Sequence, residues 1–148
     1  MPGNTFLGAG MKFPPQVDKA TGRFVVSSEE ESVKESVYLI LMTQKTERFL
    51  RPEFGSNLMS YTFMDINATT VNMMIRDLTQ QILEQEPRVR DVAITTDSQV
   101  KDGCLLVNID YTVRSSNVRD NLVFPFYLNA TAEEEAYEPE QYESEELE

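Results

Sequence analysis

Histidine and tryptophan are absent from this chain of 148 residues, and cysteine occurs once, as Cys104. The absence of histidine excludes Ser-His-Asp triads, Cys-His dyads and the common zinc sites that combine His with Cys. A single cysteine excludes an intrachain disulfide, and with it the framework of a small secreted domain, so we expect a reducing compartment. We interpret Cys104 as a small residue at the start of a strand.

Other signals of chemistry or targeting are missing as well. The chain has no Gly-rich loop followed by Lys-Ser or Lys-Thr and no dinucleotide fingerprint, which argues against nucleotide chemistry. It has no clustered block of Lys and Arg, so nucleic acid is not an expected partner. Neither a run of about 18 apolar residues nor a basic region before an apolar run occurs. We therefore expect a cytoplasmic protein with no cofactor, no metal and no direct membrane insertion.

The formal charge of -12 is concentrated at one end of the chain. Residues 131–148 hold nine Glu and no Lys or Arg, which leaves -3 for residues 1–130. Such a segment buries too little apolar surface to offset the entropy of ordering, so we expect a disordered acidic tail. The Gly- and Pro-rich residues 1–22 predict an irregular N-terminal arm, followed by a short strand at 24–26. Residues 23–130 are expected to form one domain.

Two segments have the periodicity of amphipathic helices. The first follows Ser28 and Glu31, which have the spacing of a capping box, and extends to about Met42. The second ends near Gln85, because Pro87 disfavours the helical conformation at the residue before it. The apolar stripes are Val33, Val37, Ile40 and Leu41 in the first helix, and Val71, Met74, Ile75, Leu78 and Ile82 in the second.

The segment between the two helices, residues 47–60, predicts an ordered loop or a short strand because it contains Pro52, Gly55 and several small polar residues. We expect four of its apolar side chains to point into the protein: Phe49, Leu50, Phe54 and Leu58.

Beyond the second helix the period changes from helical to two. Residues 89–96, 104–114 and 121–128 each predict a strand, with Asp102-Gly103 as a hairpin turn between the first two. Pro125 has no N–H to donate, so the last strand is expected at an edge of the sheet. The predicted fold class is α+β, a small antiparallel β-meander packed against two main helices.

Glycoside hydrolysis by two carboxylates is the enzyme class that this composition leaves open. The candidate carboxylates are Glu47, Glu53, Asp65, Glu86 and Asp91. The Glu-x8-Asp-x5-Thr spacing of phage-type lysozymes is absent, because no Glu is followed by Asp nine residues later. A lysozyme-like peptidoglycan hydrolase is therefore an alternative to a structural role, and an adaptor that acts through its acidic tail is another.

Two charged clusters lie where the periodic patterns break. One lies between the helices and the other, Glu86-Pro87-Arg88, at the junction of helix and meander. Either cluster fits a solvated connector, whose surface ion pairs are worth about 0–1 kcal/mol each. Either also fits a contact surface, because Pro fixes the direction of its neighbours and Arg can make a two-pronged contact. The candidate residues of the first cluster are Glu47, Arg48, Arg51, Pro52, Phe54 and Gly55.

Four short motifs occur in one order along the chain: Gly10-Met11-Lys12-Phe13-Pro14-Pro15, Thr21-Gly22-Arg23, Glu47-Arg48 with Arg51-Pro52-Glu53-Phe54-Gly55, and Glu86-Pro87-Arg88. In this order they resemble the baseplate wedge and sheath-initiator family of contractile phage tails and contractile injection systems. That family includes a type VI secretion subunit and has members labelled lysozyme-like. Thr46 stands where many members have Gly, and Gln85 where many have an aromatic residue, so we expect no anchor at Gln85.

The resemblance, which runs from about Gly10 to Leu128, implies a structural subunit without catalytic activity. Six copies are expected in the baseplate of a phage tail or tail-like particle, assembled in the cytoplasm, with the tube or hub as a further contact. Glu86, Pro87 and Arg88 are implied to dock on the helical bundle of the wedge proteins.

The resemblance also implies that the C-terminal strands interlock with the first ring of sheath subunits. Unpaired amides and carbonyls at a strand edge can accept a strand from another chain, which agrees with this role. The residues assigned to the sheath contact are Leu105, Val107, Ile109, Tyr111, Leu122, Phe124 and Phe126.

Overall fold

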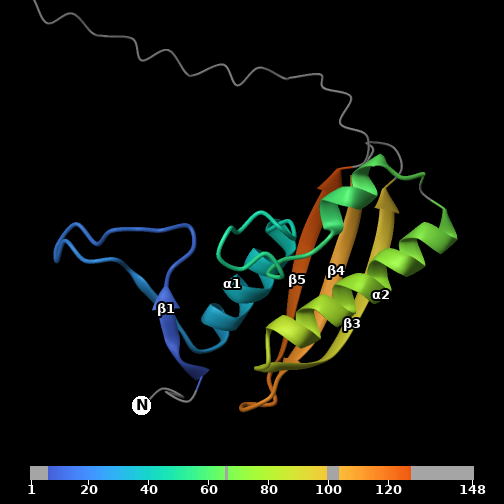
Figure 1. The fold of residues 1–148 in the computed structure, drawn as a ribbon. Helices are drawn as coiled ribbons and strands as arrows, with labels where there is room; N and C mark the ends of the chain where they lie inside the picture. Colours follow the sequence, from blue (N-terminus) through green and yellow to red (C-terminus); the bar gives the residue numbers. More distant parts are fainter. Residues whose placement is uncertain (1–6, 66, 100–103, 128–148) are drawn as a thin grey trace, which may run out of the picture.

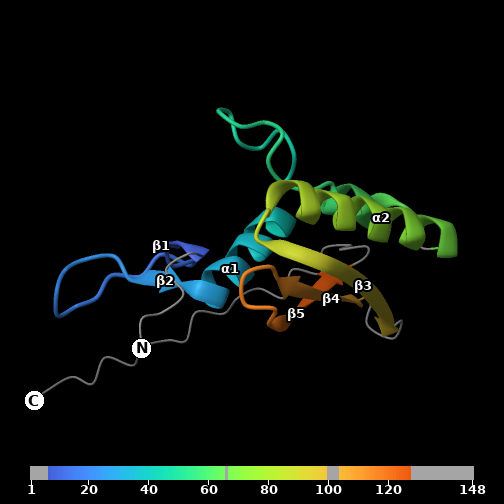
Figure 2. The same cartoon turned by 90° about the horizontal axis from the view of Figure 1, so that it is seen from below.

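The computed structural model describes residues 7–65, 67–99 and 104–127. A three-stranded antiparallel sheet is formed by β3 (Val89–Gln99), β4 (Cys104–Val113) and β5 (Arg119–Tyr127), with β4 in the middle. Two helices, α1 (Glu29–Met42) and α2 (Ala68–Gln85), pack against it. Figures 1 and 2 show α2 lying along one face of the sheet, with α1 beside it. The predicted α+β class is confirmed.

The hydrophobic core lies between this face of the sheet and the helices. Alternate side chains of β4 are buried, as the period of two predicted, and the stripe of α1 is buried throughout. In α2 the side chains of Met74, Leu78 and Ile82 are buried, whereas Val71 and Ile75 are partly buried. Burial of each large apolar side chain stabilises the fold by about 1.5–3 kcal/mol, so these stripes determine how the helices sit on the sheet.

The N-terminal arm is more regular than predicted. β1 (Ala9–Met11) pairs antiparallel with β2 (Val26–Ser28), and an isolated bridge joins Val17 to Phe24. The residues between these strands extend away from the body as a long loop, blue in Figure 1. The strand predicted at 24–26 begins two residues later. Leu7, which lies just before β1, is only 4% exposed and belongs to the core.

Helix α1 begins where it was predicted, but without the predicted cap. The Ser28 side chain makes no capping hydrogen bond. The Glu31 carboxylate instead accepts a hydrogen bond from Lys12 Nζ at 3.0 Å. The capping-box prediction is wrong because β1 lies beside the first turn of the helix. Lys12, the residue that follows β1, therefore reaches the Glu31 carboxylate and pairs with it.

The segment between the helices is an ordered loop that leads into a short 3-10 helix, η2 (Leu58–Phe63). Leu58 is buried and Phe54 is partly buried, as predicted, but Phe49 and Leu50 are 95% and 89% exposed. The inward placement predicted for those two side chains is therefore wrong. Figure 2 shows the reason, which is that the loop projects beyond both helices on the side away from the sheet.

The strand predictions differ from the structure mainly at their ends. The strand predicted at 89–96 continues to Gln99, and the last strand begins two residues early, at Arg119. Pro125 lies on an edge strand, as predicted. The Asp102-Gly103 turn, Leu128 and the acidic tail lie outside the described residues. In the described part of the chain, no helix is both long and apolar enough to cross a membrane.

Candidate interaction sites

The Glu86-Pro87-Arg88 segment forms a tight corner between α2 and β3, which we call the corner. The Glu86 N–H caps α2 by donating to the Ile82 carbonyl at 2.9 Å, and the Val89 N–H turns back to the Glu86 carbonyl at 3.1 Å. The Arg88 guanidinium donates two hydrogen bonds to the Glu86 carboxylate, from Nε and Nη2, each at 2.7 Å. Glu86 is only 3% exposed, so this two-pronged ion pair points into the protein.

Arg88 also ties the corner to two distant segments. Its Nη1 donates to the Leu7 carbonyl at 2.9 Å and lies 3.4 Å from Ser32 Oγ on α1. Burial opposes ionisation of Glu86, but the hydrogen bonds from Arg88 and Ser36 outweigh it, so the pKa of Glu86 lies below its ordinary value. The Glu86 hydrogen bond raises the pKa of Arg88. The pair is therefore charged, and it cross-links the arm, α1 and the α2–β3 junction.

A shallow cavity of about 270 Å³ opens on the outer side of the corner, lined by Leu7, Pro87, Arg88, Arg114 and Ser115. Arg114 closes the base of the sheet beside it, because its backbone N–H donates to the Arg88 carbonyl at 2.8 Å and its Nε donates to the Val89 carbonyl at 3.1 Å. Pro87 is exposed at the rim. The surface that the corner offers is thus a proline ring and an apolar cavity beside two guanidinium groups, with the Glu86 carboxylate turned away from it.

The other predicted cluster lies on the loop that projects in Figure 2, residues 44–55, which we call the projecting loop. Two hydrogen bonds hold the outgoing and returning segments of the loop together. They run from the Lys45 N–H to the Ser56 carbonyl at 3.1 Å and from the Thr46 N–H to the Pro52 carbonyl at 2.7 Å. Glu47 closes the first turn, since its carboxylate accepts from the Gln44 N–H at 2.9 Å. Thr46 occupies the left-handed region with φ 75°, a conformation that glycine adopts at little cost.

Gly55 fixes the base of the projecting loop. Its φ is 110°, and a Cβ atom at this position would lie 2.2 Å from the Thr43 carbonyl oxygen. The Ser56 N–H donates to that same oxygen at 2.8 Å, which draws the two ends of the loop together. Only glycine fits both the backbone angle and the close approach.

Gln85 joins the projecting loop to the end of α2, immediately before the corner. Its carboxamide accepts from the Gly55 N–H and donates to the Gly55 carbonyl, both at 2.8 Å, and also donates to Gln81 Oε1 at 2.9 Å. The expectation that Gln85 supplies no anchor is therefore wrong. An amide side chain can satisfy both polar groups of one backbone residue, and here it connects two of the sequence motifs directly.

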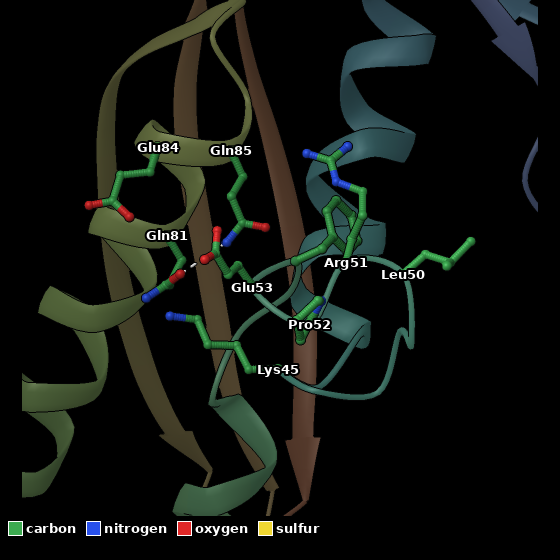
Figure 3. A pocket seen from close by; sticks show the side chains of 9 residues that line it. Lys45, Leu50, Arg51, Pro52, Glu53, Gln81, Glu84 and Gln85 are labelled. Atoms are coloured by element: carbon green, nitrogen blue, oxygen red, sulfur yellow. Dashed lines mark hydrogen bonds between the residues drawn. The ribbon is translucent and has the colours of Figure 1, made fainter.

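Between the projecting loop and the last turns of α2 lies a cavity of about 710 Å³. Lys45, Glu53, Leu50 and Arg51 of the loop all contribute to its lining. In Figure 3 the side chains of Lys45 and Glu53 lie on the side of α2, and the ends of the Leu50 and Arg51 side chains extend away from that helix. The Arg48 guanidinium lies over the Phe54 ring, 4.2 Å from its centroid, so Arg48 packs within the loop. Of the loop residues predicted to act, Glu47, Arg48, Phe54 and Gly55 shape the loop, and Arg51 and Pro52 are exposed on it.

The two strands assigned to the sheath contact, β4 and β5, occupy different places in the sheet. β4 is paired on both sides, so it has no free edge, and its side chains Leu105, Val107, Ile109 and Tyr111 are in the core. Phe124 and Phe126 of β5 are also buried, and Leu122 is partly buried. The buried members of this set pack in the core of the subunit, so a contact through these strands would involve their backbone more than these side chains. Of the two strands assigned to the sheath, β5 is the one with an outer edge at which a partner strand could pair.

The edge of β5 is fastened to α1 and β4 through Asp120. Its carboxylate lies 3.4 Å from Lys34 Nζ and accepts from the Tyr111 hydroxyl at 3.0 Å and from the Asn121 N–H at 2.8 Å. Burial and the Asp120 carboxylate raise the pKa of Tyr111. Alternate residues of an antiparallel strand direct their N–H groups to the same side. Pro125 has no N–H to donate to β4, and the Asn121 N–H donates to the Asp120 carboxylate, so we infer that the N–H of Val123, which lies between them, points to the free edge.

In residues 7–65, 67–99 and 104–127, no three His, Cys, Asp or Glu side chains are grouped so as to hold a metal ion. The lowered pKa of Glu86 is the opposite of what a general acid needs. The corner, the projecting loop and the edge of β5 each leave groups exposed at the surface of the subunit.

Comparisons with known proteins show the family to which the chain belongs. The model of a family described as baseplate wedge protein gp25 matches residues 27–118. This match spans more than half of the chain, so the chain belongs to this family of baseplate wedge proteins.

Among curated proteins, the chain is 29% identical over 82 residues to baseplate wedge protein gp25 of Enterobacteria phage T4, covering 55% of this chain and 62% of that protein. It thus spans less than two thirds of that relative. A crystal structure from Geobacter sulfurreducens, provisionally described as a tail lysozyme, is 39% identical with a TM-score of 0.67 and covers 74% of this chain and 100% of its own.

A chain of the anti-feeding prophage baseplate, solved by cryo-electron microscopy with 6-fold symmetrisation, is 23% identical with a TM-score of 0.57. It covers 84% of this chain and 89% of its own. At this level of identity the likeness shows the fold alone.

Proposed function

We propose that this protein is a non-catalytic wedge subunit that connects the wedge proteins of a contractile baseplate to the first ring of sheath. In this proposal six copies surround the tube or hub, in line with the 6-fold symmetrised baseplate that contains a chain of the same fold. The subunit assembles in the cytoplasm and ends in the baseplate of a phage tail or tail-like particle. The family match, which spans both the projecting loop and the corner, carries the proposal.

The proposed wedge contact is the corner, used in a more specific way than the sequence motif implied. Since Glu86 is only 3% exposed, its carboxylate serves the contact by holding Arg88 and Pro87 in place. The docking surface is then Pro87 with the adjoining cavity and Arg114, and it fits the helical bundle expected of the wedge proteins.

Co-expression with the cognate wedge proteins tests this contact. Pro87→Glu places a charge on the surface and leaves the ion pair intact, whereas Glu86→Ala with Arg88→Ala removes the pair. We expect both variants to lower recovery of the wedge complex at least ten-fold, and Thr69→Glu, an exposed position on α2, to have no effect. Normal recovery with both corner variants would show that the docking assignment is wrong.

The proposed sheath contact is addition of a partner strand to the free edge of β5. Deleting β5 is a poor test, because Phe124 and Phe126 are core residues and the subunit would unfold. Val123 is 50% exposed, and the alternation of the ladder directs its N–H toward the free edge. Val123→Pro removes that donor without removing a bond to β4, and Val123→Ala keeps the donor. We expect baseplates without sheath from Val123→Pro and sheathed particles from Val123→Ala.

Absence of catalysis is part of the proposal, and the description of the Geobacter relative as a tail lysozyme gives a reason to test it. The Glu86 carboxylate is held by Arg88, which leaves it unsuited to donate a proton. We expect the purified protein to release no soluble fragments from peptidoglycan. Release that disappears in Glu86→Gln or Glu53→Gln would establish the hydrolase instead.

A further inference from the structure

Phe49 and Leu50 are adjacent in sequence, form the tip of the projecting loop and are 95% and 89% exposed. We call this pair the tip. A mobile loop could fold such side chains back onto the body, but the hydrogen bonds of Lys45, Thr46, Glu47 and Gly55 hold this loop in one shape. Figure 2 shows it standing clear of both helices. The tip is thus an apolar projection on a rigid support.

Rigid support matters for binding. Ordering a flexible loop on a partner costs conformational entropy, and a loop that already has its bound shape avoids most of that cost. Here the loop accepts an unfavourable φ of 75° at Thr46 and a close backbone approach at Gly55 in order to keep its shape. Large apolar side chains presented in this way are typical of the anchor residues that dominate binding energy.

The charges around the tip indicate what receives it. The loop carries Lys45, Arg48 and Arg51 against Glu47 and Glu53, a positive balance on a chain whose formal charge is -12. The Glu47 carboxylate accepts the Gln44 N–H inside the loop, and Arg51 points away from α2 in Figure 3. In the described residues Arg51 has no ion-pair partner within 4.0 Å. The tip is therefore flanked by a positive charge that is available to a partner.

We propose that Phe49 and Leu50 insert into an apolar cleft, rimmed by carboxylates, on a neighbouring protein of the assembled particle. A projecting pair of side chains needs a concave receiving surface, and the rim must supply the negative charge that Arg51 meets. This contact goes beyond the proposed function, since it uses neither the exposed face of the corner nor the edge of β5. Gln85, which bonds to Gly55, holds the loop in a fixed position relative to the corner.

A photo-crosslinking residue at position 49 tests the proposal in the assembled particle. With p-benzoylphenylalanine in place of Phe49, we expect a cross-link to apolar residues of another baseplate protein that have Asp or Glu nearby. The same residue in place of Phe63, which is 91% exposed on η2, is the matched control. A cross-link only to a second copy of this chain, to a basic surface, or to nothing would overturn the proposal.

Exchange of the tip separates this contact from the others. We expect Phe49→Ser with Leu50→Ser to lower the yield of assembled particles at least ten-fold, and Phe63→Ser to leave it unchanged. Arg51→Glu should lower the yield less, by about three-fold. This yield should be measured at low salt, because salt screens exposed charges. The exposed Lys19→Glu on the arm is the charge control. Wild-type yield from the tip variant would refute the insertion while leaving the tests at Pro87 and Val123 intact.

Discussion

The corner and the tip reverse the usual placement of side chains in opposite ways. At the corner, the carboxylate of Glu86 is 3% exposed and bonded twice to Arg88, whereas at the tip Phe49 is 95% exposed. A buried charge is tolerated when internal partners offset its desolvation, as Arg88 does here, so the pair is explained inside the subunit. Two adjacent large apolar side chains on a fixed loop gain nothing inside the subunit, so we attribute their exposure to a partner. The two regions are joined by Gln85.

The comparison predicts its largest effect at the corner. Glu86→Ala leaves the Arg88 guanidinium without its carboxylate. Loss of one partner of a fully buried pair costs about 3–5 kcal/mol, and the 28% exposure of the Arg88 side chain makes this an upper bound here. We expect the free energy of unfolding in urea to fall by about 3 kcal/mol, near the lower end of that range. Phe49→Ser, by contrast, should change it by less than about 0.5 kcal/mol, as for exposed positions in general. Similar losses at both sites would contradict the distinction.

Gly55→Ala is expected to have the next largest effect. The added Cβ would lie 2.2 Å from the Thr43 carbonyl oxygen at a φ of 110°, so the loop base must open. We expect a loss of about 2–4 kcal/mol, in the range of severe local strain. Thermal unfolding measures it, and Gly22→Ala, where φ is 68° but no atom lies within 4 Å, is the control. Equal losses at both positions would mean that the angle alone matters.

Gln85→Ala tests the link between the two regions. It leaves the Gly55 N–H and carbonyl without their side-chain partner, and unpaired buried polar groups cost about 1–3 kcal/mol. We expect a loss of stability in that range and faster hydrogen exchange at Gly55, measured by NMR. Gln80→Ala removes an exposed glutamine from the same helix and serves as the reference. Unchanged exchange at Gly55 would mean that the loop stands without Gln85.

Acid should weaken the corner by less than these substitutions, because protonated Glu86 still fills its site. The pKa of Glu86 is lower in the folded protein than its ordinary value of 4.5. The folded state therefore binds fewer protons, so this contribution is present above pH 4.5 and is lost as the pH falls through the folded pKa. The stability difference between wild type and Glu86→Gln should narrow below pH 4.5. A constant difference down to pH 3 would show that Glu86 does not titrate with folding.

Thr46→Gly is expected to have the smallest effect, and a stabilising one. A β-branched residue at φ 75° is strained by about 1–2 kcal/mol, and glycine removes that strain at an entropic cost of about 0.5–1 kcal/mol. We expect a gain of up to about 1 kcal/mol in unfolding experiments. Thr46→Val, which keeps the branched side chain, should give no gain. A loss with glycine would mean that the Thr46 side chain supports the loop.

Periodicity predicted the parts of the fold that depend on burial of one face. The stripe of α1 and the alternation of β4 were read correctly because each element buries a regular set of side chains. Pro125 predicted the edge strand because a missing N–H is a local property of the sequence. The cap of α1 was wrong because Lys12, remote in sequence, takes the Glu31 carboxylate.

The sites were harder to predict than the fold. The motif identified Glu86 and Arg88, but nothing local shows that the carboxylate turns inward or that Arg88 reaches the Leu7 carbonyl. Phe49 and Leu50 were placed in the core because hydrophobic residues usually are, and only the direction of the loop shows otherwise. The role of Gln85 could have been inferred from its amide group, which is able to pair with a backbone residue.

The hydrogen bond from Arg88 to the Leu7 carbonyl joins residues 81 positions apart. Closing a loop of that length costs entropy before any contact offsets it, so such contacts form late in folding. The hairpins of the meander are local by comparison. We therefore expect the N-terminal segment to be the last part to pack against the body during folding and the first to detach from it during unfolding. Since Leu7 lines the cavity at the corner, the docking surface that we propose is complete only when folding of the subunit is finished.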